Sequence, residues 1–181
     1  MAIMADTEPT TLKEVQLRLR VPQHVLIHLC EKGVVIPDFA ETSGRGKRRE
    51  FSKRNLFEFA VALTLRELEL SVATTALVVR LLRSFERATA RALPGFVLFE
   101  HILEKRLELT LYLLDGRHLV VDARGGTLGR PVMLGVDIGA TPRDPNARPR
   151  IEKLRSLPED FDGRLELNLS RIARKVLQSG P

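Results

Sequence analysis

Cysteine, aromatic residues and long apolar runs are all scarce in this 181-residue chain. The single cysteine, Cys30, excludes an intrachain disulfide and any metal site built from several thiolates. One Tyr and no Trp argue against a surface on which RNA bases stack. No apolar run reaches the roughly 20 residues of a membrane-spanning helix, and residues 1–9 lack the basic and apolar regions of a secretory signal. We therefore expect a reduced, cytoplasmic protein that does not enter a membrane.

Positive charge is concentrated in one short segment. The chain carries 29 Lys and Arg against 23 Asp and Glu, and this net charge of +6 is compatible with a polyanionic partner. Residues 41–54 alone hold six basic and two acidic residues. Within it, residues 41–49 are polar and punctuated by glycines, so we predict a hairpin or flexible loop there, whose basic side chains reach phosphates without competing helical packing. These side chains are Arg45, Lys47, Arg48 and Arg49.

Helical periodicity and capping residues predict four helices before Pro94. Thr10 or Thr11 can cap the first helix, with Glu14 in capping-box position. Gly33 follows the second helix at the position favoured for a left-handed cap, and Ser52 can cap the third. The predicted helices span residues 12–20, 22–32, 53–69 and 72–92.

The first two helices are joined by a tight turn and form a helix-turn-helix candidate. In such a unit, the second helix presents its N-terminal side chains to base edges in the major groove of DNA. Gln23, His24 and His28 are the candidates for these groove contacts, because Gln pairs with adenine and His donates to purine N7 or phosphate. Arg18 and Arg20 are second candidates for phosphate contacts. The ordinary alternative is a helical hairpin with solvent-facing polar residues.

Several short motifs follow one another in an order that carries a family resemblance. They are Thr11-Leu12-Lys13-Glu14-Val15, Val21-Pro22, Cys30-Glu31-Lys32-Gly33-Val34-Val35-Ile36-Pro37, Arg49-Glu50-Phe51-Ser52, Asn55-Leu56 and Leu65-Arg66-Glu67-Leu68-Glu69-Leu70-Ser71. By this order and spacing, about the first 70 to 80 residues resemble the winged-helix DNA-binding domain of the MerR family. The resemblance implies a homodimeric transcriptional regulator that binds a near-palindromic operator in double-stranded DNA.

Two departures limit what the resemblance implies. The family usually has an arginine and two aromatics in the recognition helix, where this chain has Ile27, His28 and Leu29. The basic loop stands where the family has its wing. It keeps an arginine and an aromatic residue, Arg49 and Phe51, but it lacks the glycine–tyrosine pair that usually precedes them. The operator sequence therefore does not transfer from the family.

After Pro94-Gly95 the pattern changes from helical to alternating. Asp115-Gly116 joins two alternating runs and predicts a hairpin. Residues 141–150 contain three prolines and three arginines and are predicted to form an exposed loop. The other predicted elements are a short helix to Lys105, strands at 107–113, 118–121, 131–139 and 165–169, and a terminal helix at 170–178.

The C-terminal half shows no metal-ligand spacing, nucleophile motif or phosphate-binding loop. Lone histidines beside strands are more often structural than catalytic. We therefore expect no enzyme activity, no cofactor and no metal, and a sheet that binds a small molecule, a protein partner or another subunit. The polar residues of this half that could carry chemistry are His101, Asp115, His118, Asp122 and Asp137.

The sequence thus predicts an α+β protein with a tail at residues 1–9, a MerR-like winged helix at 10–93 and a small sheet-containing domain at 94–181. Its predicted function is sequence-specific DNA binding in transcriptional regulation, with a protein-interaction adaptor as the alternative. Two roles remain open for helix 72–92, whose apolar stripe suits either a homodimer seam or an internal core. The stripe consists of Leu77, Leu81 and Phe85.

Overall fold

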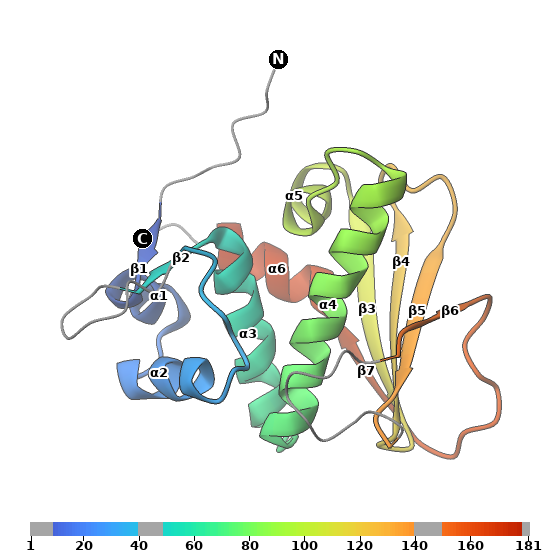
Figure 1. The fold of residues 1–181 in the computed structure, drawn as a ribbon, viewed down its shortest axis with the longest axis horizontal. Helices are drawn as coiled ribbons and strands as arrows, with labels where there is room; N and C mark the ends of the chain where they lie inside the picture. The colour runs from blue at the N-terminus through green and yellow to red at the C-terminus, as the bar shows by residue number, and fades with distance from the viewer. Residues whose placement is uncertain (1–8, 40–48, 140–149, 179–181) are drawn as a thin grey trace.

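A computed structural model describes residues 9–39, 49–139 and 150–178, which form a mixed fold of helices and antiparallel sheets (Figure 1). The N-terminal elements are β1 (Thr10–Thr11), α1 (Leu12–Leu19), α2 (Gln23–Glu31), β2 (Glu50–Phe51), α3 (Lys53–Glu67) and α4 (Val72–Ala92). The C-terminal elements are α5 (Leu98–Glu104), β3 (Leu107–Leu114), β4 (His118–Gly125), β5 (Val132–Asp137), β6 (Glu152–Leu154), β7 (Arg164–Asn168) and α6 (Leu169–Gln178). The predicted α+β class is confirmed.

Capping residues define the helix ends much as the sequence predicted. The Thr11 hydroxyl accepts a hydrogen bond from the Glu14 N–H, and the Glu14 carboxylate accepts one from the Thr11 N–H at 2.6 Å. Ser52 accepts a hydrogen bond from the Asn55 N–H at 3.1 Å. Gly33 has a φ of +65°, a left-handed conformation that glycine adopts without strain. These caps stabilise α1 and α2, because helices this short are marginal by themselves.

The N-terminal helices enclose a small apolar core together with the two short strands. β1 and β2 pair in antiparallel register, with Thr10 opposite Phe51 and Thr11 opposite Glu50. Phe51 is fully buried and meets Phe59 of α3 edge-on, with ring centroids 5.2 Å apart. The pairing fixes the chain at Glu50 beside the start of α1.

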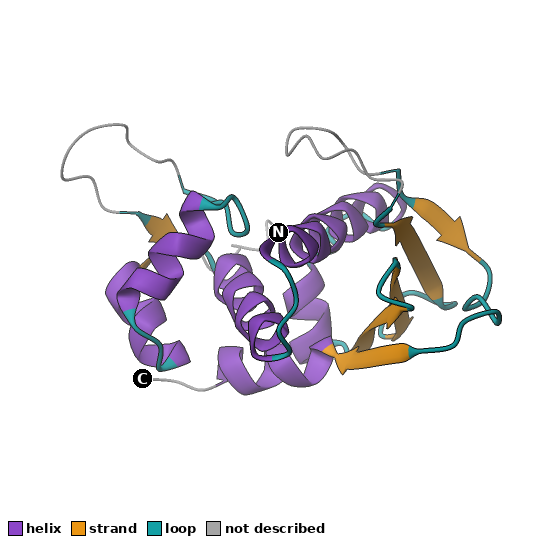
Figure 2. Cartoon of the chain, turned by 90° about the horizontal axis from the view of Figure 1, so that it is seen from below, coloured by secondary structure: helices purple, strands orange, loops and turns teal. Residues whose placement is uncertain are grey.

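The five-stranded sheet has the order β6-β5-β4-β3-β7, and Figure 2 shows the helices gathered on one side of it. The alternating residues of β3 and β4 divide between two faces, as the period-two pattern predicted. One face packs on the helices, and the other carries a smaller apolar cluster around Tyr112 and Met133. The helix-facing side chains are Leu107, Leu109, Leu111, Leu113, Leu119, Val121 and Ala123.

The apolar stripe of helix α4 is buried within the chain itself. Leu77, Leu81 and Phe85 are all buried, in one apolar cluster with β3 and β4. The same cluster extends from α3 through the sheet to α6, across the predicted boundary at residues 93 and 94. The sequence left two roles open for this helix, a homodimer seam and an internal core. The packing shows the internal core.

A buried serine anchors α6 to the sheet. The Ser170 hydroxyl accepts a hydrogen bond from the Leu109 N–H at 2.6 Å and donates one to the Leu107 carbonyl at 3.1 Å. Ser170 is fully buried, so this hydroxyl satisfies two backbone groups of β3 that water does not reach. α6 then continues along α3, and its Val176 packs against the N-terminal core.

Candidate nucleic-acid interface

Helix α2 presents its polar side chains to solvent. Gln23, His24 and His28 are exposed, whereas Leu26 is fully buried. Pro22 precedes the helix and supplies no side-chain cap. Gln23 and His24 therefore lie in the first turn, where backbone N–H groups without an intrahelical partner can bind an anion such as phosphate.

The two second-rank phosphate candidates lie at the turn between α1 and α2. Arg20 is exposed and has a φ of +55°, and its N–H donates to the carbonyl of Gln16 at the end of α1. Arg18 is half-buried in the last turn of the same helix. The structure thus places Arg18 in the last turn of α1 and Arg20 at its C-cap, shortly before α2 begins at Gln23.

Three residues of the predicted basic loop, Arg45, Lys47 and Arg48, lie outside the described residues. The fourth, Arg49, is half-buried and directly precedes β2. Since β2 pairs with β1, Arg49 lies beside the start of α1. The structure therefore brings one end of the loop to the helix pair.

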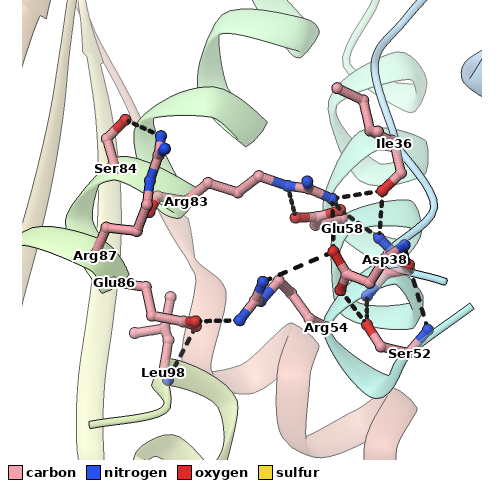
Figure 3. Close-up of polar contacts among 11 residues, drawn as sticks. Ile36, Asp38, Ser52, Arg54, Glu58, Arg83, Ser84, Glu86, Arg87 and Leu98 are labelled. Atoms are coloured by element: carbon pink, nitrogen blue, oxygen red, sulfur yellow. Dashed lines mark hydrogen bonds and ion pairs between the residues drawn. The ribbon is translucent and has the colours of Figure 1, made fainter. Parts of the chain in front are cut away.

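Asn55 joins the chain on both sides of the loop. Its side-chain oxygen accepts hydrogen bonds from the Asp38 N–H at 2.8 Å and the Ser52 N–H at 3.3 Å. Its amide nitrogen donates to the Ile36 carbonyl at 2.9 Å. The Ser52 hydroxyl also donates to the Asp38 carboxylate. Because Asp38 precedes the loop and Ser52 follows it, these bonds fix the base of the loop against α3 (Figure 3).

A buried ion pair connects this base to α4. Glu58 of α3 is almost fully buried and receives two hydrogen bonds from the Arg83 guanidinium, at 2.5 and 2.6 Å. Arg83 also donates to the Ile36 carbonyl at 2.7 Å. Burial raises the pKa of Glu58, while the hydrogen bonds from Arg83 and Asn55 act in the opposite direction. The pair therefore depends on Arg83, which supplies the only guanidinium bonded to Glu58 within the described residues.

A second ion pair extends the network to α5. The Arg54 guanidinium lies 2.5 Å from the Glu86 carboxylate, and the other Glu86 oxygen accepts the Leu98 N–H at 3.1 Å. Asp38 lies 3.7 Å from Arg54 and 3.6 Å from Arg83, between the two pairs. The loop base is thus connected through charged side chains to α3, α4 and the start of α5 (Figure 3).

This network was not predicted from the sequence, although one feature of the sequence indicates it. Glu58 stands within the apolar run Leu56-Phe57-Glu58-Phe59-Ala60-Val61, where a carboxylate has no solvated face to occupy. Such a residue requires a buried cation. Which arginine supplies it depends on how α3 and α4 pack, and the spacing along the chain does not reveal that.

The role of Ser52 at the loop base can be separated from its role as a helix cap. Replacing Ser52 with alanine is expected to cost about 1–2 kcal/mol of unfolding free energy, since the cap is lost, and to weaken DNA binding. Ser71→Ala removes the matching N-cap of α4, which lies away from the loop. Chemical denaturation and DNA anisotropy of both variants measure the two effects. Equal DNA affinity in the two variants would show that the loop base plays no part in binding.

Two of the polar residues named in the C-terminal half, His101 and Asp115, make contacts that stabilise the fold. The His101 ring lies 4.4 Å from the Phe96 ring, and its Nδ1 is 2.9 Å from the Val97 carbonyl. The Asp115 carboxylate accepts hydrogen bonds from the N–H groups of Asp162 and Gly163. In the N-terminal half, Cys30 of α2 is half-buried against the apolar core. Each of these side chains thus has a structural contact that accounts for its position.

Metal-binding clusters and membrane-spanning helices are both absent from the described residues. Residues 9–39, 49–139 and 150–178 contain no group of three or more His, Cys, Asp or Glu that could hold a metal ion. Within the same ranges, no helix is both long and apolar enough to cross a bilayer. The chain matches no protein-family model and no curated protein.

Proposed function

We propose that this protein is a sequence-specific duplex DNA-binding regulator of transcription, with a winged helix-turn-helix of the MerR type. The observation that carries the proposal is the pairing of β1 with β2. It brings Arg49 and the end of the basic loop beside a helix pair whose second helix exposes Gln23, His24 and His28. One unit thus offers groups for base edges and groups for phosphates.

In this proposal, each element has a distinct task on the duplex. The first turn of α2 enters the major groove, where Gln23 and His24 contact base edges and His28 follows one turn later. Arg18 and Arg20 contact the backbone from the α1–α2 turn, and the loop with Arg45, Lys47, Arg48 and Arg49 contacts it beside the groove. A homodimer bound to an inverted repeat is part of the proposal. Its interface involves a surface other than the buried stripe of α4.

Replacing Gln23 with alanine is expected to change sequence preference more than total affinity. A good base contact contributes roughly 1–3 kcal/mol of discrimination at its position. The variant should therefore bind duplexes with another base at that position almost as tightly as the selected duplex. Binding to the selected duplex and to single-base variants of it, measured by fluorescence anisotropy, tests this. Gln178→Ala, at the end of α6, is the matched control. An unchanged preference profile for Gln23→Ala would remove this residue from the interface.

A protein-interaction adaptor is the alternative, and one observation favours it. β7 lies at the edge of the five-stranded sheet, and its polar residues Arg164, Glu166 and Asn168 share one face. An edge strand can pair with a strand of another protein. An adaptor would bind duplex DNA weakly and without sequence preference, so DNA titration separates the two functions.

A further inference from the structure

A groove of about 1170 Å³ lies between the N-terminal helix pair and the C-terminal helix. Its walls come from α1 and the following turn, from α3, and from α6 with the end of β7. Concave sites between helices are common places for small ligands, whose pockets usually measure about 300–1,000 Å³. The groove is somewhat larger than this range, so a small molecule can fit within it.

The surface of the groove contains apolar side chains that the described residues leave at least partly exposed. Leu17 of α1 is 65% exposed, the largest value among the exposed large apolar residues of the described chain. Leu63 of α3 is half-buried, as are Ile172 and Val176 of α6. An apolar ligand that covered these side chains would remove their surface from water, and this stabilises a complex.

Positive charges stand on two opposite walls of the same groove. Arg18 and Arg20 come from the α1 side, and Arg171 comes from α6. In the part of the chain that the structure describes, the guanidinium groups of these three arginines form no ion pair with a carboxylate. The two carboxylates that line the groove are Glu14 and Glu67. That of Glu14 accepts hydrogen bonds from the N–H and hydroxyl of Thr11, and the charge of Arg18 acts on it without a direct ion pair. The three arginines outnumber the two carboxylates of the groove, so they can hold an anion from outside.

We propose that this groove binds a small amphiphilic organic anion, with an apolar body and one carboxylate or sulfate group. The apolar body lies on Leu17, Leu63 and Ile172, and the anionic group is held by Arg18 and Arg171 from opposite sides. Such a ligand bridges α1 and α6, which supply two walls of the groove.

A regulatory consequence follows, and it rests on the proposed DNA-binding function. Arg18 and Arg20 are also the proposed phosphate contacts of the helix pair, so an anion bound to them competes with the DNA backbone. The ligand should therefore weaken DNA binding, and DNA should weaken ligand binding by the same factor, because coupling between two sites is reciprocal.

The test uses the full chain and dodecanoate as the probe, below its micelle concentration, in isothermal titration calorimetry. We expect saturable binding of one dodecanoate per chain, and clearly weaker binding of the uncharged analogue dodecanol. Arg18→Gln combined with Arg171→Gln should weaken dodecanoate binding roughly fivefold or more, since exposed ion pairs contribute up to about 1 kcal/mol each. Arg130→Gln combined with Arg155→Gln removes the same charge at exposed positions outside the groove and should leave binding unchanged.

A second variant tests the apolar part of the site without disturbing the core. Because Leu17 is mostly exposed, Leu17→Asn should leave the circular dichroism spectrum unchanged and weaken dodecanoate binding. Equal binding by all variants, or no saturable binding, would overturn the proposal. Binding of an acidic helical peptide without binding of dodecanoate would also overturn it, in favour of a protein partner. Dodecanoate titrations without DNA test the groove alone, so a failure of DNA binding would contradict only the proposed function.

Discussion

Replacing Arg83 with methionine is expected to lower the free energy of unfolding by about 3–5 kcal/mol, because it leaves the charge of Glu58 buried without its partner. Glu58 has a side-chain exposure of 2%, so solvent cannot take the place of the lost guanidinium. The same substitution removes one of the two hydrogen bonds that the Ile36 carbonyl accepts and leaves the one from Asn55. Chemical denaturation at neutral pH measures the loss.

The cost of Arg83→Met should depend on pH in a defined direction. Burial raises the pKa of Glu58 above its ordinary value of 4.5, and removing Arg83 takes away hydrogen bonds that lower this pKa. A carboxyl whose pKa is raised on folding binds more protons in the folded state, so its contribution to stability is present below the unfolded pKa and lost as the pH rises through the folded pKa. The difference in free energy of unfolding between the variant and the parent protein should therefore be smallest near pH 4.5 and largest at neutral pH.

Two further variants separate the ion pair from other effects of the substitution. Arg91→Met changes an exposed arginine of the same helix and should alter stability by less than about 0.5 kcal/mol. Glu58→Leu combined with Arg83→Met should recover most of the lost stability, since apolar residues often replace a buried ion pair at little cost. A loss of less than about 1 kcal/mol in Arg83→Met alone would contradict the importance given to this pair.

Neutralising the basic loop is expected to reduce DNA affinity for every duplex and to flatten its dependence on salt. Each phosphate contact contributes about 0.9 to the slope of log affinity against log salt on B-DNA. A variant in which all four basic residues of the loop become alanine should therefore lose up to about 3.6 from this slope. The residues replaced are Arg45, Lys47, Arg48 and Arg49.

A charge-matched control is needed, because any loss of four positive charges weakens attraction to DNA at long range. The control is a second variant, in which four basic residues of the C-terminal part become alanine. These side chains are exposed and lie far along the chain from the helix pair. The control should keep the slope of the parent protein within error. If both quadruple variants flatten the slope equally, the loop is not a specific phosphate-binding element. The control residues are Arg130, Arg150, Lys153 and Arg155.

The features of the fold that the sequence predicted are those encoded within a few residues. Thr11 with Glu14, and Ser52 with Asn55, cap α1 and α3 because each cap is complete within one turn of chain. Alternation of Leu107, Leu109 and Leu111 likewise defines β3, since the period of two is local. β1, β2 and β6 were missed because two or three residues are too few to show a period.

The candidate site was predictable only in part, for a related reason. Gln23, His24 and His28 follow from helical spacing, and the structure places all three on the exposed side of α2. The pairing of Glu58 with Arg83 and the groove beside Leu17 depend on contacts between residues far apart in sequence. Such contacts are set by how the helices pack, and one sequence alone does not specify them.

The measurement that tests the central proposal most directly is selection of the purified protein against a random duplex library, followed by anisotropy titration across a salt series. The proposal predicts enrichment of an inverted repeat, bound roughly a thousandfold or more tightly than random duplex, with a steep salt dependence that the loop variant flattens. Enrichment of no sequence, with only weak and uniform binding to all duplexes, would contradict sequence-specific regulation and leave the protein-interaction adaptor as the better account.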